Sequence, residues 1–518
     1  MHLNLKDLGL SGALDHLKDT RRGLEKESLR VDLRGNISKK EHPKSLGSAL
    51  TNSYITTDFS EALLELVTPT FTKTQDCLDF LTELHSYVHL SLKDEMLWPL
   101  SMPCLIESDD EIKIGKYGNS NSGKIKSIYR KGLSHRYGSK MQAIAGIHYN
   151  FSFSDSFIKK IQEIKGDSNK SFKQIKSEVY LSVARNFKRY EWLYFLLFGA
   201  SPSFSESFTE KVKGFKKISK GGFYGEHSTS LRMGDLGYIS QIQDDLNISI
   251  NSVDEYIKDL KGALTKKHDR YEEIGEFIEQ ERIQLNTSII QIENEYYSTI
   301  RPKRICPSGE RPINILRSEG IEYLELRCVD LDPFSPIGIE RSQIDFLDLL
   351  LLLCLIKESP SLDKEESAYL KENHRRVINY GRSPDLQIYF ENKEVNAITL
   401  AKSLISQMYE ICQELGQFSS EIDHWIKSLK EQEEKIKNLE LTPSGKLIKK
   451  ITKEGLSHQD LGVEIAFEHF DFFQHYNGSL QEDFKKEAFL STEKQANIES
   501  EEELSFEDYL KEFLNKVS

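Results

Sequence analysis

The segment 21–31 constrains the fold most, because its side chains alternate in character as they do in a β-strand. In such a strand Glu25 and Glu27 share one face, about 7 Å apart. Paired carboxylates suit a hard cation such as Mg²⁺, which would remove the cost of burying unpaired charge. In the alternative interpretation this face meets water, and Lys26 and the flanking arginines are surface partners of the acids.

Three later segments repeat this pattern of a polar group on the face of a strand. Residues 63–67, 143–153 and 320–328 each predict a strand. The polar groups that they carry are Glu65, His148, Glu325 and Arg327. The plainer interpretations are an edge strand that turns Glu65 to water, a structural role for His148, and a simple ion pair between the acid and the arginine.

An antiparallel sheet with helices on one face and ligand on the other would bring these groups together. Asp58 lies shortly before one of the strands and adds a fifth carboxylate. Five carboxylates and a histidine exceed the needs of one Mg²⁺, so we expect two or three ions, with Mn²⁺ as a substitute. Several such ions beside arginines are the equipment of phosphoryl transfer from ATP.

Composition excludes several classes of protein. The chain has 518 residues, 38% hydrophobic and 29% charged, with a net charge of −13, which argues against nucleic-acid binding. The six cysteines form no C-x-x-C pair, so we expect a reducing cytosol and no zinc site. The N-terminus lacks a signal pattern, and the longest apolar run, 349–356, is too short to span a bilayer. We expect a cytoplasmic monomer without a membrane partner.

One glycine-rich run imitates a phosphate-binding loop. Residues 118–124 nearly match the P-loop, but Ile125 stands where Ser or Thr would reach Mg²⁺. The strand that should precede such a loop is also poor. A polar loop before a helix at 124–136 is the better interpretation.

The later part of the chain is increasingly helical. Before it, Arg301, Lys303 and Arg304 could bind phosphate or form an exposed basic turn. The last residues place apolar side chains at helical spacing and predict a docked terminal helix. We expect a catalytic sheet core with inserted helices in residues 1–340, and a helical part packed on it in residues 341–518.

Several runs, in chain order, carry a resemblance to a known family. They are residues 22–27, 56–59, 98–103, 146–152, 229–232, 301–304 and 334–338. Together they resemble bacterial glutamate–cysteine ligase of the proteobacterial type, also called γ-glutamylcysteine synthetase. The resemblance covers residues 20–340 approximately and weakens beyond. Ser28 stands where Thr is expected but keeps the hydroxyl, and Met233 with Gly234 puts only a loop shape in doubt.

The resemblance implies an α+β fold with a glutamine-synthetase-like antiparallel sheet of about six strands, whose concave face binds ATP and Mg²⁺. The implied metal ligands are Glu25, Glu27, Asp58, Glu65, His148 and Glu325. The implied cysteine pocket consists of Tyr129, Arg232, Tyr238 and Tyr297. Arg327 is implied to stabilise the transferring phosphoryl group, and Asn150 and Arg304 are implied to contact ATP.

The implied reaction joins the γ-carboxylate of L-glutamate to the amine of L-cysteine, the first step of glutathione biosynthesis. Because oxide is a poor leaving group, ATP first converts the carboxylate to an acyl phosphate, and the amine then attacks through a tetrahedral intermediate. Two alternatives stay open. One is a related carboxylate–amine ligase with another acceptor amine, and the other is a metal-dependent binding or scaffold protein without catalysis.

Overall fold

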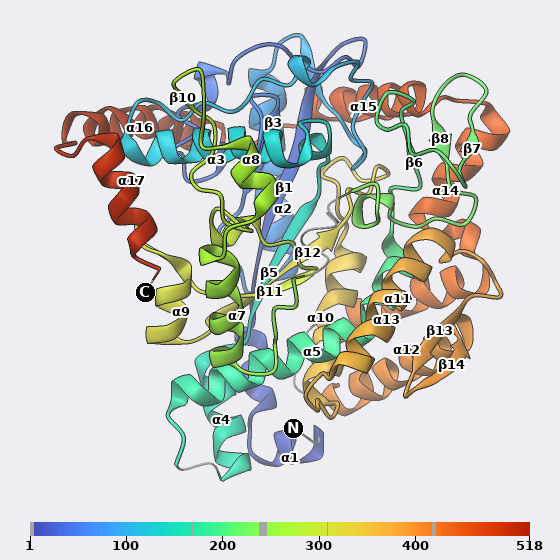
Figure 1. The fold of residues 1–518 in the computed structure, drawn as a ribbon. Helices are drawn as coiled ribbons and strands as arrows, with labels where there is room; N and C mark the ends of the chain where they lie inside the picture. Colours follow the sequence, from blue (N-terminus) through green and yellow to red (C-terminus); the bar gives the residue numbers. More distant parts are fainter. Residues whose placement is uncertain (1–4, 167–168, 238–245, 308, 417–420, 518) are drawn as a thin grey trace.

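The computed structural model describes residues 5–517 apart from 167–168, 238–245, 308 and 417–420. Its centre is one antiparallel sheet with the strand order β11-β12-β5-β1-β3-β2, and β4 pairs with the end of β1. Figure 1 shows this sheet in the middle of the molecule with helices around it. The strands are β1 (Arg21–Asp32), β2 (Ile55–Thr57), β3 (Leu63–Val67), β4 (Glu95–Leu97), β5 (Ile147–Ser152), β11 (Ile300–Lys303) and β12 (Tyr323–Val329). The expected antiparallel sheet of about six strands is confirmed.

Alternation along β1 and β5 sorts the side chains between the two faces of the sheet. Leu24 lies opposite Tyr149, and both are fully buried. Glu25 lies opposite His148 on the other face. The hydroxyl of Tyr149 donates a hydrogen bond to Asp348, so the apolar face packs against the helix that carries this aspartate.

Helices α2, α5 and α10 cover this apolar face. Helix α10 is buried along most of its length and is mainly apolar, and its two aspartates are buried as well. The helices up to this point are α1 (Leu5–Leu10), α2 (Thr74–Ser91), α3 (Asn121–Tyr137), α4 (Asp155–Lys165), α5 (Phe172–Phe198), α7 (Val253–Thr265), α8 (Asp269–Ile274), α9 (Pro312–Glu319) and α10 (Arg341–Ile356). The small strands are β6 (Ser203–Phe204), β7 (Lys216–Lys217), β8 (Phe223–Tyr224), β9 (Phe277–Ile278), β10 (Glu281–Arg282), β13 (Gln387–Phe390) and β14 (Lys393–Asn396).

Helix α3 replaces the suspected phosphate loop. It begins at Asn121, inside the glycine-rich run and three residues earlier than expected. The hydroxyl oxygen of Ser120 accepts a hydrogen bond from the N–H of Gly123 at 3.1 Å, which is an ordinary N-cap. The polar residues of the run therefore start a helix. Among the described residues, no helix combines the length and the apolar character needed to cross a membrane.

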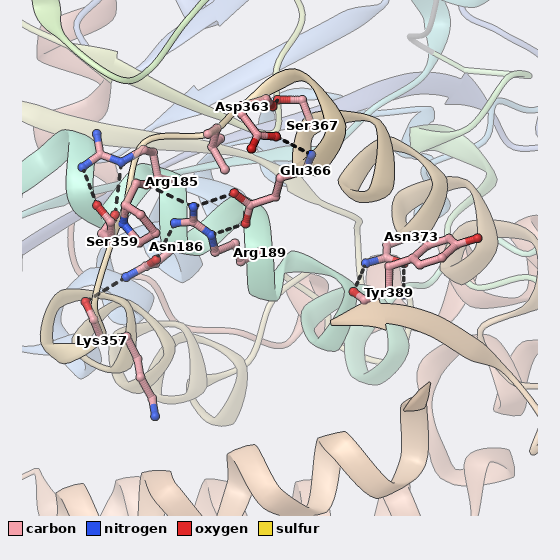
Figure 2. A network of polar contacts seen from close by, with 12 residues as sticks. Arg185, Asn186, Arg189, Lys357, Ser359, Asp363, Glu366, Ser367, Asn373 and Tyr389 are labelled. Atoms are coloured by element: carbon pink, nitrogen blue, oxygen red, sulfur yellow. Dashed lines mark hydrogen bonds and ion pairs between the residues drawn. The ribbon is translucent and has the colours of Figure 1, made fainter. Parts of the chain in front are cut away.

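The remaining helices lie between residues 364 and 515. They are α11 (Lys364–Tyr380), α12 (Ala397–Leu415), α13 (Ile422–Lys437), α14 (Pro443–Lys449), α15 (His458–Gln474), α16 (Gln481–Ser500) and α17 (Phe506–Asn515). Figure 2 shows how α5 joins the start of this part: Arg189 forms an ion pair with Glu366, and Arg185 donates to the hydroxyl and the carbonyl of Ser359. The expected boundary near residue 340 stays a prediction.

The last two helices return to the first half of the chain. The hydroxyl of Ser491 on α16 accepts from the N–H of Ser48 at 3.0 Å. Asn121, at the start of α3, donates to the carbonyl of Leu504 just before α17. Figure 1 shows α17 running from the end of α16 toward α9. The expected docked terminal helix is confirmed, and it ties together segments that lie far apart in the sequence.

Candidate active site

Strand register places the predicted polar residues on one face of the sheet. Glu25 lies opposite His148, Glu27 opposite Glu65, and Asn150 opposite Glu325. Residues directly opposite each other in antiparallel strands project from the same face. Strand β3 lies between β1 and β2, so the edge-strand interpretation of Glu65 is wrong.

Three of these side chains converge closely. Glu25, Glu65 and His148 present ligand atoms that all lie within 4.8 Å of one another. The Nδ1 atom of His148 lies 3.0 Å from a carboxylate oxygen of Glu25, and Nε2 lies 3.7 Å from Glu27. The side-chain amide of Asn150 donates to the other oxygen of Glu25 at 2.7 Å. The histidine and the amide therefore fix the orientation of this carboxylate.

The acids on this side of the face repel one another. Burial raises the pKa of Glu65 well above its usual value, and the charges of Glu25 and Asp58 raise it further. Burial also raises the pKa of Glu27, again with Asp58. At Glu25 burial acts in the same direction, but the hydrogen bond from His148 lowers the pKa below its usual value. Crowded, partly desolvated acids of this kind favour a bound cation.

Strands β11 and β12 supply the positive charge on the other side. Lys303 lies 3.3 Å from Glu325, Arg327 lies 3.2 Å from it, and Arg301 lies 4.0 Å from it. Although burial opposes ionisation, these three cations hold the pKa of Glu325 well below its usual value. The Arg327 pKa is raised despite burial, because the charges of Glu325 and Glu27 stabilise the guanidinium. The face thus has an acidic side and a basic side that meet at Glu325.

Arg232 lies beside this boundary in a fixed position. It is fully buried, and its guanidinium donates to the carbonyl of Arg327 at 3.0 Å. Asp330 lies 3.6 Å away from it and is itself held by the hydroxyl of Ser201 at 2.8 Å. The positive charge of Arg232 lowers the pKa of Glu27, against the stronger effect of burial, which raises it.

Two of the three predicted tyrosines lie near the acidic side. Tyr129 projects from α3, and Tyr297 comes shortly before β11. Burial raises the pKa of both hydroxyls, and the negative charge of Asp58 contributes to both shifts. Tyr297 donates to the side chain of Gln142 at 3.4 Å. Tyr238 lies outside the described residues.

A cavity of about 320 Å³ adjoins the basic side. Arg301, Lys303 and Arg304 line it on one side, and Tyr256 and Tyr323 add aromatic surface. Lys303 also contacts the Glu325 carboxylate, so the cavity and the acidic cluster are direct neighbours. Aromatic rings with several cations provide the surfaces that a nucleotide base and its phosphates need.

Two residues with evident roles were missed from the sequence. Asp330 anchors Arg232, although it looked like one more residue after a strand. Arg130 follows Tyr129 on α3, stacks on the Tyr117 ring at 4.5 Å, and lowers the pKa of Glu65 against the stronger effect of burial. A charged residue beside a predicted pocket residue was the available signal for Arg130. Asp330 offered only its position directly after a strand.

Comparison with known proteins places the chain among enzymes. Residues 5–377 match the family model described as glutamate-cysteine ligase. A relative from Alcanivorax borkumensis named glutamate–cysteine ligase is 42% identical over 508 residues, which cover 96% of each chain. One from Hahella chejuensis with the same name is 41% identical over 520 residues, which cover 97% of this chain and 96% of the relative. These matches extend through the helical C-terminal part, where the resemblance carried by the sequence motifs is weaker.

A solved structure gives the same result for the fold. Glutamate–cysteine ligase from Francisella tularensis, crystallised in complex with AMP, has a TM-score of 0.89 to this structure at 34% sequence identity. The match covers 96% of this chain and 97% of that one. The fold is therefore shared over nearly the whole length of both chains. The chain belongs to the glutamate–cysteine ligase family.

Proposed function

We propose that the polar face of the sheet joins the γ-carboxylate of L-glutamate to the amine of L-cysteine at the expense of ATP. The products are γ-glutamylcysteine, ADP and phosphate, and the intermediate is γ-glutamyl phosphate. The observation that carries the proposal is the contact of Lys303 and Arg327 with Glu325, where a converging acid cluster meets a cationic cavity. Phosphoryl transfer needs both halves of this arrangement. The names of the relatives, and the AMP in the Francisella complex, support it.

The acid cluster fits divalent cations. Its donors are mostly carboxylate oxygens, which Mg²⁺ and Mn²⁺ prefer. The raised pKa of Glu65 means that local positive charge does not balance these acids. When bound, such ions neutralise charge on phosphate and carboxylate oxygens. We assign two or three ions to Glu25, Glu27, Asp58, Glu65, His148 and Glu325.

The residues of the basic side position and stabilise the phosphates. Arg327 contacts Glu325, and the charge of Glu27 also stabilises its guanidinium, so we assign this group to the phosphoryl group during transfer. Arg304 lines the cavity, and Lys303 lies between the cavity and Glu325, which suits contacts to the rest of ATP. These cations are preorganised by the sheet, so little reorganisation accompanies the transfer.

Asn150 has two assignments that are compatible. Its amide nitrogen donates to Glu25 in this structure, while its amide oxygen has no hydrogen-bond partner among the described residues. The residue can therefore orient the carboxylate and still accept a hydrogen bond from a substrate group such as the adenine amino group or the ribose.

We assign the cysteine pocket to Tyr129, Tyr297, Tyr238 and Arg232. The first two rings line the approach to Asp58, and the arginine supplies positive charge beside Glu27. A substrate carboxylate would share the guanidinium with Asp330, which lies 3.6 Å from it. The pocket would exclude water from the amine while it attacks.

The direct test is a coupled assay for ADP release. We expect ADP release that requires both glutamate and cysteine and stops when divalent metal is chelated. A carboxylate–amine ligase with another acceptor would release ADP faster with a different amine. A binding protein without catalysis would bind ATP but form no ADP in the presence of the two amino acids, which would refute the proposal.

A second assay tests the acceptor pocket. If Arg232 binds the carboxylate of the acceptor, 2-aminobutyrate should be a fair substrate, because one small group is worth about 1–3 kcal/mol. Cysteamine should be much poorer, because it lacks the carboxylate. In Arg232→Ala the kcat/KM ratio of the two amines should approach one. An unchanged ratio would remove Arg232 from the pocket.

The proposal takes the single chain in the cytoplasm as the active unit. All six cysteines are unpaired, and five of them are buried, as suits a reducing compartment. Size-exclusion chromatography with light scattering on the active enzyme would test the monomer.

A further inference from the structure

Helix α17, near the C-terminal end of the chain, contacts the wall of the cavity of about 320 Å³ that adjoins the basic side. The proposed function places the nucleotide in this cavity. The Phe513 ring lies 4.6 Å from the guanidinium carbon of Arg311, which is the residue before α9. Lys516 donates to the carbonyl of Gly309 at 2.8 Å, and its own carbonyl accepts from Asn314. Helix α17 therefore holds the segment that joins β11 to α9, which borders the cavity (Figure 1).

Arg311 forms a buried ion pair inside this wall. Its side chain is fully buried, its Nη2 atom lies 2.8 Å from one oxygen of Glu293, and its Nε donates to the other at 3.1 Å. The same carboxylate accepts a weaker hydrogen bond from the N–H of Ile313, in the first turn of α9, at 3.3 Å. Two parallel contacts from one guanidinium fix the carboxylate in direction as well as in charge.

Glu293 connects this pair to the proposed active site. Its carbonyl oxygen accepts a hydrogen bond from Nη2 of Arg301 at 2.9 Å. Glu293 and Arg301 both line the cavity of about 320 Å³, and Arg301 lies 4.0 Å from Glu325. A continuous chain of contacts thus leads from Phe513, through Arg311 and Glu293, to the boundary of the acid cluster.

The charges explain why this chain of contacts matters. Without Arg311, Glu293 would be a buried carboxylate with little compensation, which is strongly unfavourable. The nearest other guanidinium in this chain of contacts is Arg301, and an attraction between the two would withdraw positive charge from the cavity. The Phe513 ring covers the outer side of Arg311 and keeps the pair away from water, which strengthens it.

We propose that Arg311 and Phe513 are positioning residues for nucleotide binding, and that α17 thereby forms the outer wall of the nucleotide site. This inference rests on the proposed function, which places ATP in the cavity. Neither residue touches the reacting atoms. Both act through Glu293 and Arg301, so their loss should weaken nucleotide binding and leave the chemical step nearly unchanged.

The first experiment compares Arg311→Gln and Arg311→Lys with the wild type. For Arg311→Gln we expect the KM for ATP to rise about tenfold, which corresponds to the loss of one charged contact. The kcat should stay within about twofold, and the KM for cysteine should not change. Arg311→Lys keeps the charge and loses the planar fork, so it should recover part of the ATP affinity.

The second experiment uses a matched pair on α17. Phe513→Leu removes the ring beside Arg311 and should raise the KM for ATP about threefold. Phe506→Leu removes another ring of the same helix, which faces Lys124 of α3 at 6.0 Å, and should leave the KM unchanged. An equal effect of both substitutions would mean that α17 acts only by general docking, and the inference would be wrong.

A direct binding measurement separates this inference from the proposed function. Calorimetric titration with ADP and Mg²⁺ should rank the variants by ADP affinity in the same order as their KM values for ATP. Thermal unfolding checks that each variant is folded. A folded Arg311→Gln protein that binds ADP as tightly as the wild type overturns the inference. If Arg311→Gln does not fold, Arg311→Lys and Phe513→Leu carry the test. If the wild type forms no ADP with glutamate and cysteine, the proposed function fails, while the comparison of ADP binding still decides this inference.

Discussion

Neighbouring charges shift the pKa values of chemically identical side chains in opposite directions on this sheet. Glu65 and Glu325 project from the same face, yet the pKa of Glu65 is raised and that of Glu325 is lowered. Burial opposes ionisation at both residues. Cations surround Glu325, whereas other acids surround Glu65, and this difference decides the sign. The acidic side therefore needs an added cation, and the basic side is ready for an anion.

Glu27 gives the sharpest single-residue test of the acid cluster. Glu27→Gln keeps the size of the side chain but removes a charge that a metal would need, so activity should fall about 100-fold or more. The fold should be retained, and stability without metal should be equal or higher, because burial and Asp58 disfavour the charged form. Turnover as a function of Mg²⁺ concentration, with thermal unfolding as the control, measures both effects. Near-normal turnover at limiting Mg²⁺ would exclude Glu27 as a ligand.

Arg327 tests the assignment of the phosphoryl-transfer residue. Arg327→Lys preserves the charge beside Glu325 but loses the planar fork. We expect kcat to fall by about 10- to 100-fold, and the KM for ATP to rise much less, because the contact strengthens in the transition state. Steady-state kinetics with ATP as the varied substrate distinguish these effects. A change confined to KM would mean that Arg327 only binds the nucleotide in its ground state.

At the scale of elements, the start of β5 approaches Arg232 closely. A Cβ atom built on Gly146 would stand 2.0 Å from one terminal nitrogen of Arg232 and 2.3 Å from its guanidinium carbon. The N–H of Gly146 also donates to Glu27 at 2.8 Å, so strand and carboxylate are fixed together. Only glycine permits this arrangement of β5, because any side chain would displace the buried arginine.

Gly146→Ala should therefore impair the acceptor site more than the fold. We expect kcat/KM for cysteine to fall about tenfold or more, with a loss of stability of about 1–3 kcal/mol. Gly262→Ala is the control, because a Cβ on this glycine of α7 would meet nothing within 4 Å. That substitution should leave kinetics unchanged and raise stability by about 0.5–1 kcal/mol. Equal kcat/KM values for cysteine in both variants would argue against a place for Arg232 in the acceptor pocket.

At the scale of the whole molecule, α2 and α15 bury histidines behind the sheet. His85 and His89 on α2 stack against Phe473 on α15, at 5.5 and 4.6 Å between ring centroids. Neither ring nitrogen of His85 has a hydrogen-bond partner among the residues that the structure describes. Burial, with the charge of Lys26, lowers the pKa of His85 well below 6.5 and that of His89 to about 3.

These shifts predict acid sensitivity of the folded state. Below pH 6.5 the unfolded chain protonates both histidines and the folded chain does not, so the free energy of unfolding falls as the pH falls. Each histidine contributes a slope of about 1.4 kcal/mol per pH unit. His85→Phe should make the unfolding free energy depend less on pH. Between pH 6 and 4.5 its slope should fall by about 1.4 kcal/mol per pH unit, which denaturant unfolding measures. The exposed His475→Gln is the control, and an equal slope in all three proteins would refute the prediction.

Local sequence determined which residues share a face. The period of two in residues 21–31 and 143–153 put Glu25, Glu27 and His148 on the polar face, because the direction of a side chain in a strand depends on backbone geometry alone. The ordered family motifs then supplied the fold and the reaction. The P-loop could also be excluded from local sequence, because Ile125 has no hydroxyl at the position where the motif needs one.

Only the tertiary structure decided which of these residues meet. Strands β1, β3, β5 and β12 are separated by tens to hundreds of residues, and their register sets Glu27 opposite Glu65 and Asn150 opposite Glu325. Register and helix docking depend on packing between distant segments, which no local pattern encodes. For that reason the anchoring of Arg232 by Asp330, and the contact of Phe513 with Arg311, emerged only from the folded chain.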